Sequence, residues 1–147
     1  MIRSLIAVLI AVFVGLTTAK FIEGVGTAAY PFQESVPAGD VDGLKAAAAN
    51  APFGYKAILI AGWAVAAFVS ALISLVIGKR WAPLGWLSSG LMFFLAIITL
   101  IGTPLGFWVL PAALIVTGGG GWLAIKLLKA TNVYPVKNQA DEFFHER

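Results

Sequence analysis

Residues 81–125 read WAPLGWLSSGLMFFLAIITLIGTPLGFWVLPAALIVTGGGGWLAI, a stretch of 45 residues without one charged side chain. A single α-helix of this length would measure roughly 67 Å, more than twice the ~30 Å hydrocarbon core of a bilayer. The stretch must therefore fold back on itself. Its strongest helix-breaking cluster is the GTPLG sequence at 102–106, so we predict a hairpin of two membrane-spanning helices over 83–101 and 107–129.

Two more apolar stretches precede this hairpin. Residues 57–78 contain no charge over 22 residues, and Lys79 and Arg80 follow at once. Residues 4–22 are mostly apolar, and Lys20 is close enough to their end to extend its ammonium into the lipid headgroups. The beginning of the chain has some likeness to a cleavable secretory signal, but the apolar stretch continues past Ala19. We predict an uncleaved first span.

The overall composition agrees with a membrane protein. Of 147 residues, 60% are hydrophobic and 12% are charged, against roughly 45–50% and about 25% in soluble domains. The absence of cysteine excludes disulfides and thiolate chemistry. The expected fold class is an all-α integral membrane protein, an antiparallel bundle of four transmembrane helices that forms one domain over residues 1–147.

The connecting segments differ in character. The loop at 23–55 is polar and rich in Gly and Pro, and within it residues 40–50 predict a short helix at the membrane surface. Asp40 is suited to the N-cap, the alanines favour helix, and Asn50 before Pro52 ends it. A polar tail follows over 130–147, with a weakly amphipathic end at 141–145.

The basic residues predict the orientation, since cytoplasmic loops carry an excess of Lys and Arg. One side of the predicted topology holds Arg3, Lys79, Arg80, Lys126, Lys129 and Lys137. The other holds Lys20, Lys45 and Lys56, offset by Glu23, Glu34, Asp40 and Asp42. Both termini are therefore expected in the cytoplasm. The basic residues form no block with interleaved aromatics, so we expect the lipid bilayer as a partner and no nucleic acid.

A row of small residues recurs every four positions along the second span: Gly62, Ala66, Ser70, Ser74 and Gly78. Lipid tails give no hydrophobic drive between helices, so close backbone approach over small residues joins them. The row predicts either packing within the bundle or a contact surface for a second subunit or partner helix.

Four consecutive glycines, Gly118, Gly119, Gly120 and Gly121, lie in the middle of the fourth span. They predict a thin, closely packed or kinked helix. The alternative is a helix break whose carbonyl groups line a cavity, as in discontinuous transporter helices.

Lys20 and Glu23 lie three residues apart at the outer end of the first span. They predict an interfacial ion pair, worth under ~1 kcal/mol at a surface. The alternative is a contact with a lipid headgroup or an ion.

The sequence offers no set of residues for a catalytic or cofactor site. His145 is the only histidine and lies in the tail, and the spans contain no ionisable side chain in their core. Haem ligation, metal binding and proton pumping normally need such groups. We expect no cofactor, no metal and no enzymatic activity.

The order of several short motifs resembles a recurring type of small four-helix bacterial inner-membrane protein of uncharacterised function. Its members show a Glu followed by a Tyr-Pro pair after the first helix, and prolines with a tryptophan at the fourth. The matching residues are Glu23-Gly24-Val25-Gly26, Tyr30-Pro31, Pro52, Trp63, Pro104, Trp108 and Pro111. This sequence departs from the pattern at Thr27 and lacks a histidine in the first loop. The resemblance implies topology and a bacterial inner-membrane location, and no reaction.

These observations favour a non-catalytic accessory or structural membrane subunit that acts through helix–helix packing in a larger complex or a homo-oligomer. The alternative function is a small channel or transporter for a neutral or lipid-like solute, for which the four glycines are the only support.

Overall fold

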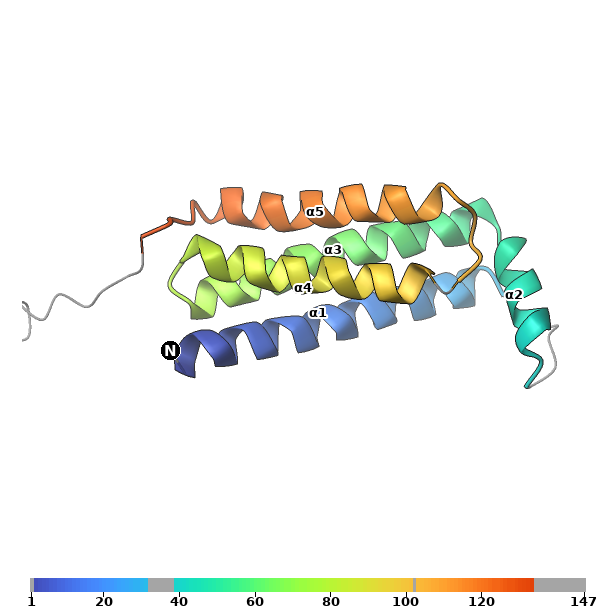
Figure 1. Ribbon diagram of the computed structural model, residues 1–147, viewed down its shortest axis with the longest axis horizontal. Coiled ribbons are helices and arrows are strands. Elements are labelled where there is room, and N and C mark those ends of the chain that lie inside the picture. The colour runs from blue at the N-terminus through green and yellow to red at the C-terminus, as the bar shows by residue number, and fades with distance from the viewer. Residues whose placement is uncertain (1, 32–38, 102, 134–147) are drawn as a thin grey trace, which may run out of the picture.

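The computed structural model describes residues 2–31, 39–101 and 103–133. Within these residues the chain forms five α-helices and no strand: α1 (Ile2–Ala29), α2 (Val41–Ala49), α3 (Phe53–Ile77), α4 (Ala82–Ile101) and α5 (Val109–Leu127). All except α2 are long and apolar enough to cross a membrane. These four lie side by side in the bundle of Figure 1. The predicted fold class, a four-helix membrane bundle, is confirmed.

The four long helices are arranged as two triangles that share the pair α3 and α4. Helix α3 packs against each of the other three, and α4 packs against α1, α3 and α5. Within the described residues α1 and α5 make no contact with each other. Because α3 and α4 meet directly, their side chains occupy the centre of the bundle. Met92 and Ala96 of α4 and Ala66 and Ala67 of α3 are completely buried there.

Helix α1 is longer than the predicted span 4–22. It continues through Gly24 and Gly26 to Ala29, just before Pro31. A methyl group on Gly26 would lie 3.1 Å from the Ile58 side chain, so this glycine permits a close contact with α3. The contact stabilises the extra turns, and Pro31 ends the helix because its ring disfavours α-conformation in the residue before it. At ~1.5 Å per residue α1 is roughly 42 Å long, which exceeds a bilayer core.

The short helix in the first loop matches its prediction closely. Helix α2 is capped by Asp40, whose side chain accepts a hydrogen bond from the Gly43 amide over 2.9 Å, and it ends at Asn50. It lies across the end of the bundle, away from the N-terminus, at a steep angle to the long helices (Figure 1). Ala48 is buried in the same cluster as Tyr55, which fixes the C-terminal end of α2 to the bundle.

The boundaries of the other spans differ from the predicted ones by a few residues. Helix α3 begins at Phe53, earlier than the predicted 57, because Pro52 occupies its N-cap position. The predicted hairpin is present between Ile101 and Val109, where Gly106 has a φ of 107°. The final span begins at Val109 and ends at Leu127, two residues inside each predicted end. Gly102, Glu34, Lys137 and the predicted amphipathic end at 141–145 lie outside the described residues.

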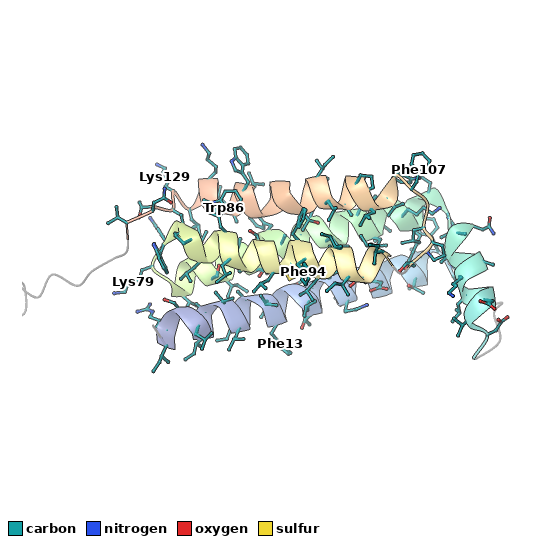
Figure 2. All side chains as sticks on the ribbon, viewed as in Figure 1. Phe13, Lys79, Trp86, Phe94, Phe107 and Lys129 are labelled. Atoms are coloured by element: carbon teal, nitrogen blue, oxygen red, sulfur yellow. The ribbon has the colours of Figure 1, made fainter. Side chains whose placement is uncertain are left out.

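Charged and apolar side chains are segregated along the bundle. Figure 2 shows Lys79 and Lys129 at the same end, near Trp86, and Phe107 at the other. Phe13 points away from the bundle (Figure 2), and it and Phe94 are both exposed. An apolar belt between two polar ends is the surface that a bilayer requires.

Candidate functional site

The small-residue row of α3 is buried along its whole length. Gly62, Ala66, Ser70, Ser74 and Gly78 all lie inside the bundle. Gly62 faces Ile22 of α1, and a methyl group added to it would lie 3.0 Å from that side chain. Towards the other end of the row, Ser74 and Gly78 face Leu84 of α4.

Gly15 of α1 packs against the middle of this row, at Ala66 and Ser70. A methyl group added to Gly15 would lie 3.0 Å from the Ser70 Cβ, 3.1 Å from the Ala66 carbonyl oxygen and 3.0 Å from the Met92 Sδ. These distances are below ordinary van der Waals contact, so α1 and α3 approach at backbone range here, with the Met92 side chain of α4 beside them. The row therefore serves packing within the bundle, and it is not available as a contact surface for a second subunit.

The buried polar side chains among the described residues are hydroxyls: Ser70, Ser74, Ser88, Ser89 and Thr117. The Oγ atoms of Ser74 and Ser88 are 2.8 Å apart and link α3 to α4. Ser74 Oγ also lies 2.9 Å from the Ala71 carbonyl oxygen and 3.2 Å from the Leu84 carbonyl oxygen, either of which can accept its single proton. Ser70 Oγ, in contrast, has no hydrogen-bond partner among the described residues.

This difference predicts opposite effects of two conservative substitutions. Ser74→Ala should lower the free energy of unfolding by about 1 kcal/mol, since Ser88 loses its interhelical partner. Ser70→Ala should leave it unchanged or raise it slightly, because an unpaired buried hydroxyl is removed. Unfolding by titration with sodium dodecyl sulfate in mixed micelles would measure both. A larger loss for Ser70→Ala than for Ser74→Ala would contradict this account.

The four consecutive glycines do not break the final helix. Helix α5 continues without interruption through Gly118, Gly119, Gly120 and Gly121. The predicted alternative of an unwound segment is wrong, and the physical reason is packing. A methyl group on Gly120 would overlap the Ala64 carbonyl oxygen of α3, and one on Gly121 would overlap the Ser89 side chain of α4. These two glycines permit close contact of α5 with α3 on one side and with α4 on the other.

The other two glycines face outward. No atom would lie within 4 Å of a methyl group on Gly118 or Gly119. Gly119 belongs to a groove of about 380 Å³ between α3 and α5. Its lining is entirely apolar and comprises Ala64, Val65 and Phe68 of α3 with Val116, Gly119, Gly120 and Leu123 of α5. We call this the α3–α5 groove, and it is the candidate functional site.

Sequence reasoning missed most of this groove. It identified the glycines but not Val116 and Leu123, whose spacing from Gly119 and Gly120 places all four on one helical face. That spacing was a usable signal. The α3 side of the groove was not predicted, because the regular pattern on α3, the small-residue row, lies on the opposite, buried face of that helix.

The predicted ion pair is present. Lys20 Nζ and Glu23 Oε2 are 2.7 Å apart at the end of the bundle that carries α2, with side chains 65% and 33% exposed. At this exposure the pair contributes little to stability. It lines a shallow hollow with Gly24, Thr27 and Ala28 on the surface of α1, and each charge already has its partner.

Comparisons of this chain with family models, with curated proteins and with solved structures find no match.

Proposed function

We propose that this chain is a non-catalytic membrane subunit that binds a transmembrane helix in the α3–α5 groove. The observation that carries the proposal is the exposed floor of the groove at Gly119, where no side chain of the described residues covers the helix backbone. Helices associate in lipid by close approach over small residues. A groove with glycine on its floor and Phe68 and Leu123 among its lining offers such an approach near the middle of both helices.

The arrangement of the helices supports a packing role over a transport role. The direct contact between α3 and α4, including the Ser74–Ser88 hydrogen bond, fills the centre where a channel between four helices would run. The alternative function, a channel or transporter for a neutral or lipid-like solute, depended on unwinding of the four glycines. With α5 continuous there, that alternative loses its support.

The location in the membrane is part of the same proposal. The end with the N-terminus, the α3–α4 turn and the C-terminal end of α5 carries Arg3, Lys79, Arg80, Lys126 and Lys129. The acidic residues within the described ranges are Glu23, Asp40 and Asp42, at or near the other end. By the excess of basic residues, we propose that the first end faces the cytoplasm of a bacterial cell and that both termini lie there.

The experiment compares two glycines that differ only in their place on the bundle. Gly119 and Gly90 both lie inside helices, and a methyl group on either would meet nothing within 4 Å. A photo-crosslinking amino acid at Val116 should give a covalent adduct of defined mass in native membranes. Gly119→Leu in that background should abolish the adduct because leucine fills the groove, whereas Gly90→Leu on α4 should preserve it.

The crosslinking result requires that both leucine variants are folded, and detergent unfolding of each variant checks this in parallel. At both positions the Cβ of the new side chain would meet no atom within 4 Å, so both variants should unfold at a detergent concentration no lower than the parent. The absence of any protein adduct at Val116, or its equal loss in both leucine variants, would contradict the proposed function. The mass of the adduct distinguishes a second copy of this chain from another subunit.

A further inference from the structure

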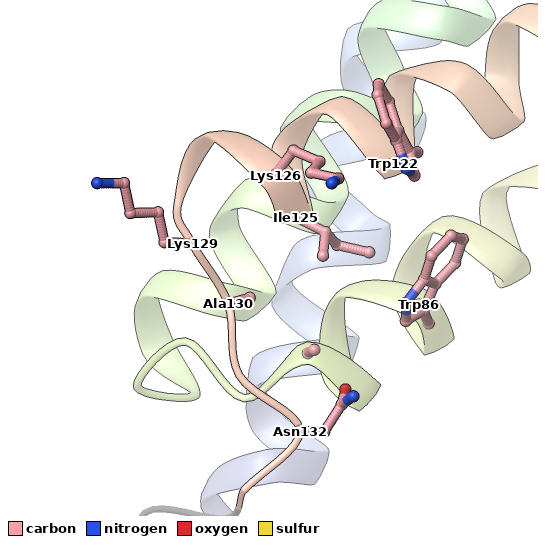
Figure 3. Close-up of a pocket in the computed structure, with 8 residues that line it drawn as sticks. Trp86, Trp122, Ile125, Lys126, Lys129, Ala130 and Asn132 are labelled. Atoms are coloured by element: carbon pink, nitrogen blue, oxygen red, sulfur yellow. The ribbon is translucent and has the colours of Figure 1, made fainter.

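A second cavity lies at the basic end of the bundle, separate from the α3–α5 groove. Its volume is about 400 Å³. Its lining includes Ala82 and Trp86 of α4, Trp122, Ile125 and Lys126 of α5, and Asn132 from the segment after α5. Figure 3 shows Trp86 facing Trp122 and Lys126 across the cavity, with Asn132 at its lower edge. We call it the basic pocket.

The positive charge of the pocket is held in place by an aromatic ring. Lys126 Nζ lies 5.5 Å from the centroid of the Trp122 ring, within the range of a cation–π contact. The ammonium is thus kept at the wall of the pocket (Figure 3). Lys129 also borders the pocket, but the end of its side chain points away in this view.

No acidic side chain in the described ranges neutralises this charge. The two ion pairs found there, Lys20–Glu23 and Lys45–Asp42, involve residues of α1 and α2 at the other end of the molecule. Among the described residues, Lys126 has no ion-pair partner and its contact is the Trp122 ring. The donors around it, the Asn132 amide and the indole N–H groups of two tryptophans, are of the kind that bind phosphate oxygens.

The floor of the pocket is fixed by backbone hydrogen bonds. The Thr131 amide donates to the Arg80 carbonyl over 2.9 Å, and the Ala82 amide donates to the Thr131 carbonyl over 2.8 Å. These bonds tie the segment after α5 to the start of α4. Lys129, with a φ of 48°, makes the reversal that brings the chain there, and the Ala130 amide closes it by donating to the Ile125 carbonyl. The pocket is thus built by three segments that are held together.

The surroundings of the pocket favour a lipid over a soluble anion. Trp86 and Trp122 are 51% and 50% exposed, and tryptophan is typical of the membrane–water interface. Ile115, which is exposed, and Phe93, which is partly buried, lie seven positions from Trp122 and Trp86 on the same helical faces, so they continue the apolar surface from the pocket along α5 and α4 towards the middle of the bundle. A phosphate in the pocket would therefore have a path for acyl chains directly beside it. Basic pockets between membrane helices bind anionic headgroups in this way.

From these observations we infer that the basic pocket binds the phosphate group of an anionic phospholipid, with Lys126 as the charged contact, Asn132 as a hydrogen-bond donor and the two tryptophans as the walls. The inference does not depend on the α3–α5 groove, which contains none of these residues.

The test is native mass spectrometry of the full chain, freed of lipid in detergent and titrated with phosphatidylglycerol or phosphatidylcholine. The parent should bind phosphatidylglycerol about fivefold more tightly, the difference that one basic residue near the membrane surface gives. Lys126→Gln should remove the preference. Lys79→Gln, which removes the same charge at the same end but outside the pocket, should retain it. Trp86→Leu should weaken binding of both lipids without changing net charge.

Three results would overturn the inference. Equal binding of both lipids by the parent would show that no anionic site exists. Equal losses in the Lys126 and Lys79 variants would show general attraction to a positive surface. Displacement of phosphatidylglycerol by an equal concentration of inorganic phosphate would show that the pocket recognises free phosphate and not a lipid. Detergent-unfolding midpoints equal to that of the parent confirm that the variants remain folded, since Lys126, Lys79 and Trp86 are all exposed.

Discussion

Gly120→Ala is expected to lower the free energy of unfolding by about 2 kcal/mol, whereas Gly119→Ala, one residue earlier, should raise it by up to about 1 kcal/mol. The two glycines occupy the same uninterrupted helix, so the intrinsic gain from replacing glycine is the same. They differ in what the new methyl group meets. At Gly120 it would overlap the Ala64 carbonyl group, while at Gly119 nothing lies within 4 Å.

The Gly120 clash is severe because the obstacle is backbone. The Ala64 carbonyl carbon would be 3.2 Å and the Phe68 amide nitrogen 3.4 Å from the added carbon. A side chain can rotate away, but the backbone of α3 can move only if the two helices separate. That separation loses dispersion contacts along the α3–α5 interface, and no water or lipid tail restores them.

Unfolding by detergent titration measures both variants, and two further glycines extend the comparison. Gly118→Ala should behave like Gly119→Ala. Gly121→Ala should be destabilising, and Ser89→Gly in the same chain should restore much of the loss, because the Ser89 side chain is what the methyl group would overlap. Similar effects at Gly119 and Gly120 would mean that the four glycines contribute only through their low helix propensity.

The sequence predicted the architecture well because a bilayer tolerates few alternatives. An uncharged stretch of 45 residues cannot cross once, so its length required a hairpin, and the GTPLG cluster placed that hairpin at 102–106. The surface helix was equally accessible, since Asp40 and Asn50 act through local hydrogen bonds that the sequence shows directly. These features depend on residues that are close together in the sequence, so they can be predicted without knowledge of the tertiary structure.

The candidate site was less predictable because it depends on which faces meet. Glycine spacing cannot say that Gly120 contacts α3 while Gly119 remains open, as this depends on the rotation of α5 about its axis. The same applies to the end of α1, where a contact between Gly26 and Ile58 overrides the helix-breaking tendency of glycine. The basic pocket joins Trp86 to Asn132 across 45 residues of sequence, and no local pattern connects them.

Ala66→Leu and Ser70→Leu are expected to be strongly destabilising, each by about 3 kcal/mol, near the upper end of the range for overpacked cores. Both residues are completely buried, and both contact the site of Gly15, where α1 and α3 approach at backbone range. A leucine at either position would have to displace α1 or Met92 of α4. Because the row is internal, the loss should appear as unfolding of the single chain and not as dissociation of folded subunits.

The control must be an alanine of α3 whose side chain faces outward. Ala64 lies on the opposite face of α3 but lines the α3–α5 groove, where it contacts α5, so it is unsuitable. Ala61 is exposed, and Ala61→Leu should shift the detergent-unfolding midpoint little, because acyl chains move aside for an enlarged side chain on a lipid face. Size-exclusion chromatography alongside unfolding separates the two explanations. A folded monomer released from a larger assembly by Ala66→Leu would place the row between subunits, whereas loss of helical signal at a lower detergent concentration places it inside one bundle.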